Sequence, residues 1–171
     1  MKLTTGKLVV AFFVVLGVIT VLGVLAIQIW GPTKQNALGS AVDNATVAAS
    51  PFTKFRTMQL KIGKTCKPVL VASTEAQQNQ GLRGVRSLAP YQGMLFAFPD
   101  DQRARFTMAD TVIPLEITFY DAKGQPISTE HMVPCPGTDL TCPTYGPNQA
   151  YRYALETEQD KMPPGALSTC S

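Results

Sequence analysis

The chain begins with a long apolar run that constrains everything after it. From Leu8 to Trp30 the sequence reads LVVAFFVVLGVITVLGVLAIQIW and contains no charged residue. An α-helix needs about 20 such residues to cross the hydrocarbon core of a bilayer. A secretory signal peptide has a shorter apolar region, of roughly 7–15 residues. We therefore expect residues 8–30 to form an uncleaved transmembrane anchor, with cleavage near Ala37-Leu38-Gly39 as the alternative.

Basic residues flank this anchor unequally. Lys2 and Lys7 precede it together with the N-terminal amine, whereas Lys34 is the only charged residue close behind it. Basic residues favour the cytoplasmic side of a membrane helix. We expect residues 1–7 in the cytoplasm and the body of the protein on the other side of a membrane that the chain crosses once.

The segment after the anchor, residues 31–54, is small and polar and has few large hydrophobic residues. This composition is typical of a flexible linker. Residues 55–171 are enough for one folded domain. From Pro51 onward, 12 lysines and arginines face 11 aspartates and glutamates, so no basic patch points to nucleic acid as a partner.

Four cysteines follow the anchor: Cys66, Cys135, Cys142 and Cys170. An even number in an exported domain indicates two disulfides, for which three connectivities are possible. We favour Cys135–Cys142, which closes a short loop rich in proline and glycine. Cys66–Cys170 would then join the start of the domain to its end.

Short stretches of alternating or continuous apolar residues predict seven strands. They cover residues 58–62, 68–72, 93–98, 103–108, 115–120, 125–132 and 151–156. One helix is expected after Thr74, where Gln77 can complete a capping box, and either Gly81 or Gly84 would end it. We predict turns at residues 99–101 and 121–124. The domain is thus expected to be mainly β, with a minor α+β character, as a compact antiparallel barrel or sandwich with one short helix.

A series of motifs occurs in a characteristic order. They are Gly81-Leu82, Arg86-Ser87-Leu88, GMLFAF at 93–98, FTMADTVIPLEI at 106–117, Phe119-x-Asp121-x-x-Gly124 and ALE at 154–156. Their joint spacing resembles the DUF192 family, also called UPF0127, whose members are small exported or membrane-tethered prokaryotic domains of unknown function. The resemblance covers Val69 to Glu156 and implies a small β-rich fold. With the anchor, it leads us to expect a protein of the inner (cytoplasmic) membrane with its domain on the periplasmic side.

The chain departs from the family pattern at four positions. Arg83 stands where the family usually has Met, Thr107 where it has Trp, Ala109 where it has Lys and Asp110 where it has Asn. If that stretch forms a binding site in typical members, this chain lacks an aromatic platform and a positive charge there.

Five residues are candidate pocket residues: Arg86, Met108, Asp110, Thr111 and Glu116. Asp110 and Thr111 lie between two predicted strands and before a proline, so they either face a pocket mouth or form a turn, and the turn is favoured. Arg86 either binds an anion or pairs internally with Glu75 or a carbonyl, and the internal pair is favoured.

His131 is the sole histidine and suggests one metal-binding alternative. With Met108, Met132, Cys135 and Cys142 it would offer the soft ligands that Cu(I) prefers. The cysteine spacing is not that of a zinc site, and a Cys135–Cys142 disulfide would consume both thiolates. We expect no metal and no cofactor, and keep a periplasmic copper-handling protein as an alternative.

Sequence motifs for catalysis are few. The chain has no Gly-x-Ser-x-Gly elbow and no phosphate-binding loop. We expect a binding or accessory module, associated through residues 8–30 with the membrane and with an envelope or membrane complex, for an unknown small-molecule ligand. The enzymatic alternative is a small hydrolase or carbohydrate-active domain that uses Asp110 and Glu116.

Overall fold

The computed structural model describes residues 37–49, 51–62, 64–161 and 165–170. The expected cytoplasmic segment, 1–7, and the expected anchor, 8–30, lie outside these ranges. Within them, none of the helices has both the length and the apolar character that crossing a membrane requires.

The described residues form two helices and ten strands. The helices are α2 (Ala37–Asp43) and α3 (Glu75–Gln80). The strands are β1 (Thr46–Val47), β2 (Arg56–Ile62), β3 (Thr65–Ala72), β4 (Gly93–Gln102), β5 (Phe106–Thr107), β6 (Leu115–Tyr120), β7 (Pro126–Met132), β8 (Thr144–Tyr145), β9 (Tyr151–Glu158) and β10 (Leu167–Thr169).

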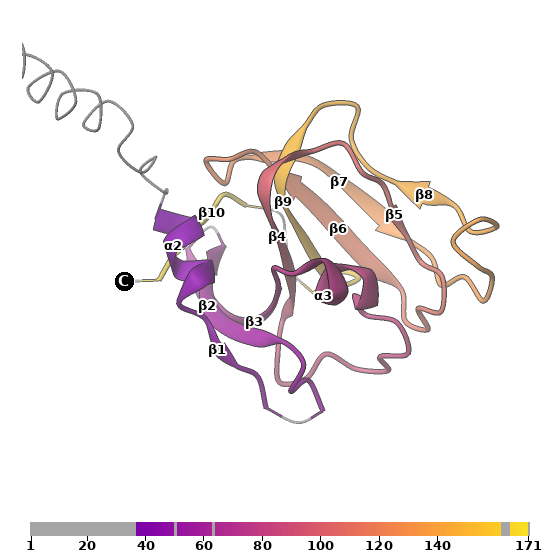
Figure 1. Cartoon of the computed structure of the whole chain (residues 1–171), viewed down its shortest axis with the longest axis horizontal. Helices are drawn as coiled ribbons and strands as arrows, with labels where there is room; N and C mark the ends of the chain where they lie inside the picture. The colour runs from indigo at the N-terminus through magenta and orange to yellow at the C-terminus, as the bar shows by residue number, and fades with distance from the viewer. Residues whose placement is uncertain (1–36, 50, 63, 162–164, 171) are drawn as a thin grey trace, which may run out of the picture. The chain divides into compact units, whose positions relative to one another are not determined.

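Eight strands belong to one sheet, in the order β1-β2-β3-β4-β9-β6-β7 with β10 also beside β2, and β5 pairs separately with β8 (Figure 1). The prediction of a mainly β domain is confirmed, and α3 is the one helix described within residues 55–171. No pairing between described strands joins β7 to the other end of the sheet, so the expected closed barrel is not found. The sheet is also not antiparallel throughout, because β3 and β4 run parallel. Parallel neighbours need a crossover connection, and α3 lies in it.

Both faces of the central strands are buried. Successive side chains of a strand point to opposite faces, so each strand supplies two different clusters. One cluster includes Leu70, Met94, Phe96, Ile117 and Ala154. The other includes Val69, Val71, Leu95, Tyr153 and Leu155.

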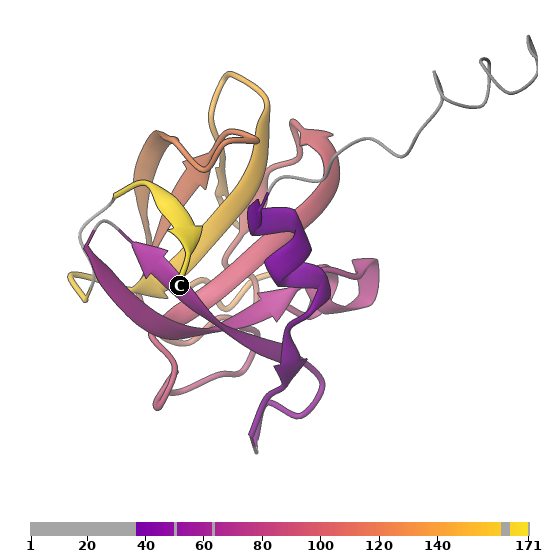
Figure 2. The same cartoon turned by 90° about the vertical axis from the view of Figure 1, so that its left-hand side faces the viewer.

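The helix α2 helps to cover the second of these faces (Figure 2). Leu38 and Val42 are four residues apart and therefore lie on one side of the helix, where both are buried in the same cluster as Leu60 and Leu167. Part of the expected flexible linker over 31–54 thus forms regular structure, in α2 and β1. The two apolar side chains of α2, donation from Arg56 to the carbonyls of Asp43 and Ala45, and the pairing of β1 with β2 hold this part against the sheet.

The predicted helix and its cap are confirmed. The Thr74 side chain accepts a hydrogen bond from the backbone N–H of Gln77, whose side-chain oxygen accepts one from the backbone N–H of Thr74. These bonds satisfy donors that the helix itself leaves unpaired. Gly81, at φ 47°, ends the helix.

The turn predicted at residues 99–101 is wrong, because β4 continues through it to Gln102. The register of β4 against β9 shifts between Ala97 and Gln102, so Pro99 sits in an irregular stretch. A proline, which lacks an N–H, is tolerated at such a bulge. The strand expected over 103–108 is correspondingly reduced to β5.

Both favoured disulfides are present. Cys66 in β3 bonds Cys170 beyond β10, with Cα atoms 6.0 Å apart, and Cys135 bonds Cys142 with Cα atoms 5.9 Å apart. Both separations lie within the usual range for disulfides. The first bond joins β3 to the C-terminal segment after β10, and the second closes a loop of residues 135–142.

Gly93 is required where β4 meets β9. A Cβ atom at this position would meet the backbone carbonyl oxygen of Glu156 and the side chain of Thr157. We expect Gly93→Ala to lower the free energy of unfolding by about 3 kcal/mol, since overpacking against backbone cannot relax easily. Chemical denaturation would measure this. The control is Gly84→Ala, at φ 72° in open space, which should cost only about 1 kcal/mol of backbone strain.

Candidate functional site

A cavity of about 790 Å³ opens on the first buried face of the sheet. Its walls come from α3 and the residues after it, β4, β5, β8 and β9, with Asp139 from the disulfide loop. A volume of this size suits a small organic ligand. The lining combines aromatic rings, side-chain amides, threonine hydroxyls and five charged groups: Glu75, Arg83, Arg105, Asp139 and Glu156.

Aromatic rings form the apolar part of this cavity. Phe96 of β4 lies edge-on to Phe106 of β5, with ring centroids 4.9 Å apart, and Phe98 lies edge-on to Tyr151 of β9 at 5.7 Å. Phe96 and Phe98 share a face because they are two residues apart on a strand. The Tyr151 hydroxyl donates to the carbonyl of Ala104 at 2.8 Å. Burial raises the pKa of Tyr151 to about 12, so this side chain stays neutral.

Glu156 is the buried acid of the cavity. It follows Ala154 by two residues on β9, which places its side chain on the same face as the aromatic rings, and it is only 4 % exposed. Its neighbours across the sheet are Met94 and Ile117, which offer no polar groups from their side chains. No side chain or backbone group of the described residues donates a hydrogen bond to the Glu156 carboxylate.

This environment changes the acidity of Glu156. Burial raises the pKa of its carboxyl to about 8 from an ordinary value of 4.5, and the positive charge of Arg83 acts in the opposite direction. Removal from water disfavours the ionised form of a carboxyl. In the empty cavity at neutral pH, Glu156 therefore carries a proton.

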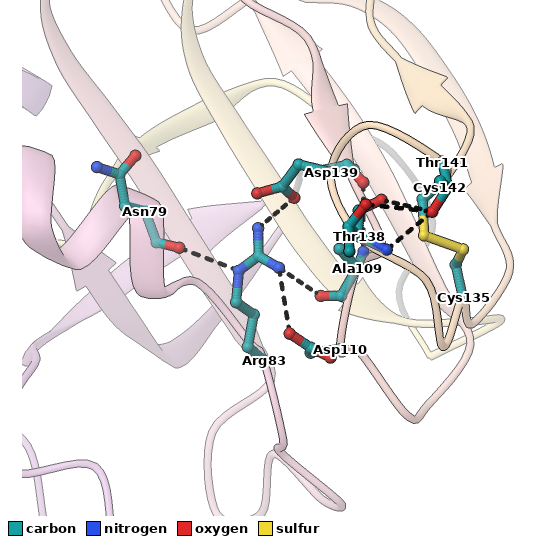
Figure 3. Close-up of polar contacts among 10 residues, drawn as sticks. Asn79, Arg83, Ala109, Asp110, Cys135, Thr138, Asp139, Thr141 and Cys142 are labelled. Carbon is teal, nitrogen blue, oxygen red and sulfur yellow. Dashed lines mark hydrogen bonds and ion pairs between the residues drawn. A yellow bond between two sulfur atoms is a disulfide. The ribbon is translucent and has the colours of Figure 1, made fainter.

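Arg83 links three segments at the edge of the cavity (Figure 3). Its Nε donates to the carbonyl of Asn79 at 3.2 Å, and its Nη1 donates to the carbonyl of Ala109 at 2.8 Å. Its Nη2 donates to Oδ1 of Asp139 at 2.6 Å, and Asp110 lies further away, with Oδ2 at 3.8 Å from Nη1. This guanidinium thus holds the end of α3, the 109–110 turn and the disulfide loop together.

The disulfide loop presents Asp139 to Arg83. Within it, the N–H of Thr138 donates to Oγ1 of Thr141 at 2.9 Å, and the N–H of Cys142 donates to the carbonyl of Thr138 at 2.9 Å. These bonds and the Cys135–Cys142 disulfide define the path of the loop (Figure 3).

Arg105 plays a similar part in another stretch of the cavity lining. Its Nε and Nη2 donate to the hydroxyl and the carbonyl of Thr144, and its Nη1 donates to the carbonyl of Gly146 at 2.8 Å. It therefore fastens the start of β5 to β8 through neutral oxygens.

The structure removes the ligands on which the copper alternative depended. Cys135 and Cys142 share a disulfide, so neither sulfur is a thiolate. The His131 side chain is 60 % exposed and places Nδ1 3.4 Å from Oε2 of Glu116. Over the described ranges, no group of three or more His, Cys, Asp or Glu side chains is arranged to hold a metal ion.

The structure separates the five candidate pocket residues. Thr111 lines the cavity and is buried, whereas Met108 is buried in the core. Asp110 adopts a turn conformation at φ 58°, in line with the favoured interpretation, although its side chain faces Arg83 rather than capping backbone groups.

Glu116 and Arg86 lie outside this cavity. Glu116 is on β6, where it faces His131. Arg86 is exposed, and no ion pair between described residues includes it, so the favoured pairing with Glu75 is not formed.

Sequence reasoning did not select the residues that matter most here. Glu156 is the last residue of the ALE motif, which contributed to the family resemblance but carried no chemical signal. Arg83 drew notice only as a departure from the family pattern. Their shared location depends on contacts between segments far apart in the sequence.

Replacing Glu156 with a residue that cannot ionise should change how the stability of the protein depends on pH. The folded protein keeps this proton up to about pH 8, whereas an unfolded chain releases it near pH 4.5. Below about pH 4.5 the carboxyl is protonated in both states and its titration does not change the free energy of unfolding. As the pH rises from there towards 8, the free energy of unfolding falls by at most about 1.4 kcal/mol per pH unit. We expect Glu156→Gln to flatten this decline. Urea denaturation between pH 5 and 8 would measure it, with Glu75→Gln, an exposed acid of the same cavity, as the control that keeps the wild-type slope.

Comparison with known proteins establishes the family. No curated protein sequence matches the chain. A protein of unknown function from Novosphingobium aromaticivorans DSM 12444 has a similar structure, with a TM-score of 0.59 and 23% identity, covering 81% of this chain and 99% of that one. A protein from Sinorhizobium meliloti 1021, described as a candidate transcription regulator, gives a TM-score of 0.58 and 23% identity over 67% of this chain and 94% of its own.

At this level of identity, the two structures show a shared fold and nothing about activity. The family model of DUF192 (Uncharacterized ACR, COG1430) matches residues 58–165, a range that includes all the motifs that suggested the resemblance. The chain therefore belongs to the DUF192 family.

Proposed function

We propose that this protein is a membrane-tethered binding module that holds a small organic molecule in the cavity around Glu156. The observation that carries the proposal is an acidic residue, Glu156, that is 4 % exposed and lines a cavity of about 790 Å³, and whose carboxylate receives no hydrogen bond from the described residues. Burying an ionisable group without a partner is costly. Ionisable groups with strongly perturbed pKa values in a cleft occur preferentially at functional sites.

The charged groups of the cavity favour binding over hydrolysis. A glycosidase-type reaction needs two carboxyl groups with separate roles on either side of the scissile bond. Asp139 is engaged by Arg83 at 2.6 Å, and Glu75 is an exposed residue in the first turn of α3. Neither Asp110 nor Glu116, on which the hydrolase alternative rested, lines the cavity.

The proposed location combines the apolar run at 8–30 with the disulfides. Disulfides persist in oxidising compartments such as the periplasm, and both pairs of cysteines lie after this run. We propose that residues 8–30 hold the domain on the periplasmic side of the inner membrane. Tethering there would raise its effective concentration towards a membrane complex that it serves.

Narrowing the cavity with a side chain that is not aromatic should weaken binding. We expect Thr107→Met to place a longer apolar chain among the cavity walls, because Thr107 is a half-buried lining residue of β5. Saturation-transfer NMR on the full-length protein in nanodiscs would test four probes: choline, glucose, phenol and benzoate. At least one probe should bind the wild type and lose at least tenfold in affinity in Thr107→Met.

The matched control is Leu140→Met, which introduces the same side chain at a residue that is 96% exposed and outside the cavity lining. This variant should bind as the wild type does. The proposal fails if all four probes show no binding to the wild type, or if Thr107→Met binds them as well as Leu140→Met does.

The anchor can be tested in whole membranes. The wild-type chain should remain in the membrane pellet after alkaline carbonate washing, and added protease should reach its domain in spheroplasts but not in intact cells. Leu16→Arg with Ile19→Arg places two charges in the apolar run, each costing about 3 kcal/mol at a bilayer centre, and should release the chain from the pellet. A wild-type chain extracted by carbonate, or a domain protected in spheroplasts, would contradict the proposed location.

A further inference from the structure

We infer that the molecule bound in this cavity carries an organic cation, an ammonium-type group that pairs with the carboxylate of Glu156. This inference rests on the proposed function and names the chemical class of its ligand. It depends on which donors around Glu156 are already engaged, on the aromatic walls and on the balance of charge in the cavity.

Among the described residues, no hydrogen bond reaches the Glu156 carboxylate, and the cationic group that acts on it is Arg83. Three of the five N–H donors of each cavity guanidinium are engaged, since Nε, Nη1 and Nη2 of Arg83 and of Arg105 each donate to other oxygens. The hydroxyl of Tyr151 donates to Ala104. These groups are directed at other acceptors, which leaves the Glu156 carboxylate available to a donor or positive charge on the ligand.

The same engagement makes an anionic ligand a poor fit. The charge of Arg83 is already paired with Asp139, whose Oδ1 lies 2.6 Å from Nη2, and each guanidinium is directed at three oxygens. An anion would also share the cavity with the carboxyl of Glu156. A cation instead supplies the charge that a buried carboxylate needs in order to ionise.

The aromatic walls favour a cation as well. The faces of Phe and Tyr rings carry negative partial charge and attract ammonium groups within about 6 Å, by roughly 2 kcal/mol where water is excluded. Phe96, Phe98, Phe106 and Tyr151 supply these rings around the acid. Apolar ring faces beside a carboxylate match the methyl groups and the positive charge of a substituted ammonium ion.

The remaining charges are nearly balanced. Glu75 of α3, Asp139 of the disulfide loop, Arg83 and Arg105 line the cavity together with Glu156, and Tyr151 on β9 stays neutral. The negative charges of Asp139 and Glu75 offset the positive charges of Arg83 and Arg105. Ionised Glu156 would thus leave one net negative charge for a ligand to neutralise.

Cation binding should release a proton. At neutral pH the free protein holds a proton on Glu156, because burial raises the pKa of this carboxyl to about 8. The carboxyl must lose that proton before it can pair with a cation. Affinity should therefore rise with pH until the free carboxyl is itself ionised, by up to about tenfold per pH unit.

The test compares choline with 3,3-dimethylbutan-1-ol, its uncharged isostere, by titration calorimetry on the full-length protein in nanodiscs. Choline keeps its charge at every pH used. We expect choline to bind roughly tenfold more tightly at about pH 8.5 than at about pH 6.5, with release of a proton, while the alcohol shows no such change. Glu156→Gln should lower the affinity for choline at least tenfold and remove the pH dependence of choline binding.

Glu75→Gln is the matched control, because it removes another acid of the cavity and should keep the pH dependence. Glu156→Gln is expected to fold, since an amide resembles the protonated carboxyl, and thermal unfolding would verify this. Equal affinity for choline and the alcohol, or unchanged choline binding in Glu156→Gln, would overturn the inference. If glucose, phenol or benzoate binds and choline does not, the inference of a cationic ligand is wrong and the proposed binding function is supported. If no probe binds, both the inference and the proposed function are wrong.

Discussion

The pairing of β4, β9 and β6 is the constraint on which the rest of the structure depends. Where these strands pair closely they are buried on both faces, so the position of a residue in the register decides which of two cores it joins. A shift of one residue would exchange the two sets of side chains and place both in the wrong environment. Close approach at Gly93, where a side chain would meet the backbone of β9, belongs to the same requirement.

That register also carries Glu156 into the interior. Its neighbours on the same face of β9 and across the sheet are apolar, and the positive charge of Arg83 only partly offsets the cost of burial. A carboxyl in such a place weakens the folded state as the pH rises, which natural proteins tolerate mainly where function requires it. This position differs from the rest of the core in lining the cavity, which the proposed function uses to give a ligand access to the carboxyl.

The rim of the cavity is assembled from segments that would have no fixed relation on their own. Arg83 brings α3, the 109–110 turn and the disulfide loop together, and Arg105 fastens β5 to β8. Three N–H donors of each guanidinium are directed at backbone carbonyls, the Thr144 hydroxyl or Asp139. The two arginines therefore organise the rim, and the proposed function leaves recognition to Glu156 and the aromatic rings.

Local patterns in the sequence were enough for six of the eight described strands of the large sheet, all but β1 and β10. They were also enough for the capping box of α3, the hairpin turn at 121–124 and the family, since each depends on neighbouring residues or on motif order. They were not enough for α2, whose two apolar residues acquire meaning only against the sheet, or for β4 beyond Pro99. Among the candidate pocket residues, only Thr111 lines the cavity. The acidity of Glu156 and the engagement of Arg83 were decided by tertiary structure alone. Desolvation and charge pairing depend on distances between residues 83, 106, 139 and 156, and these distances exist only once the sheet has formed.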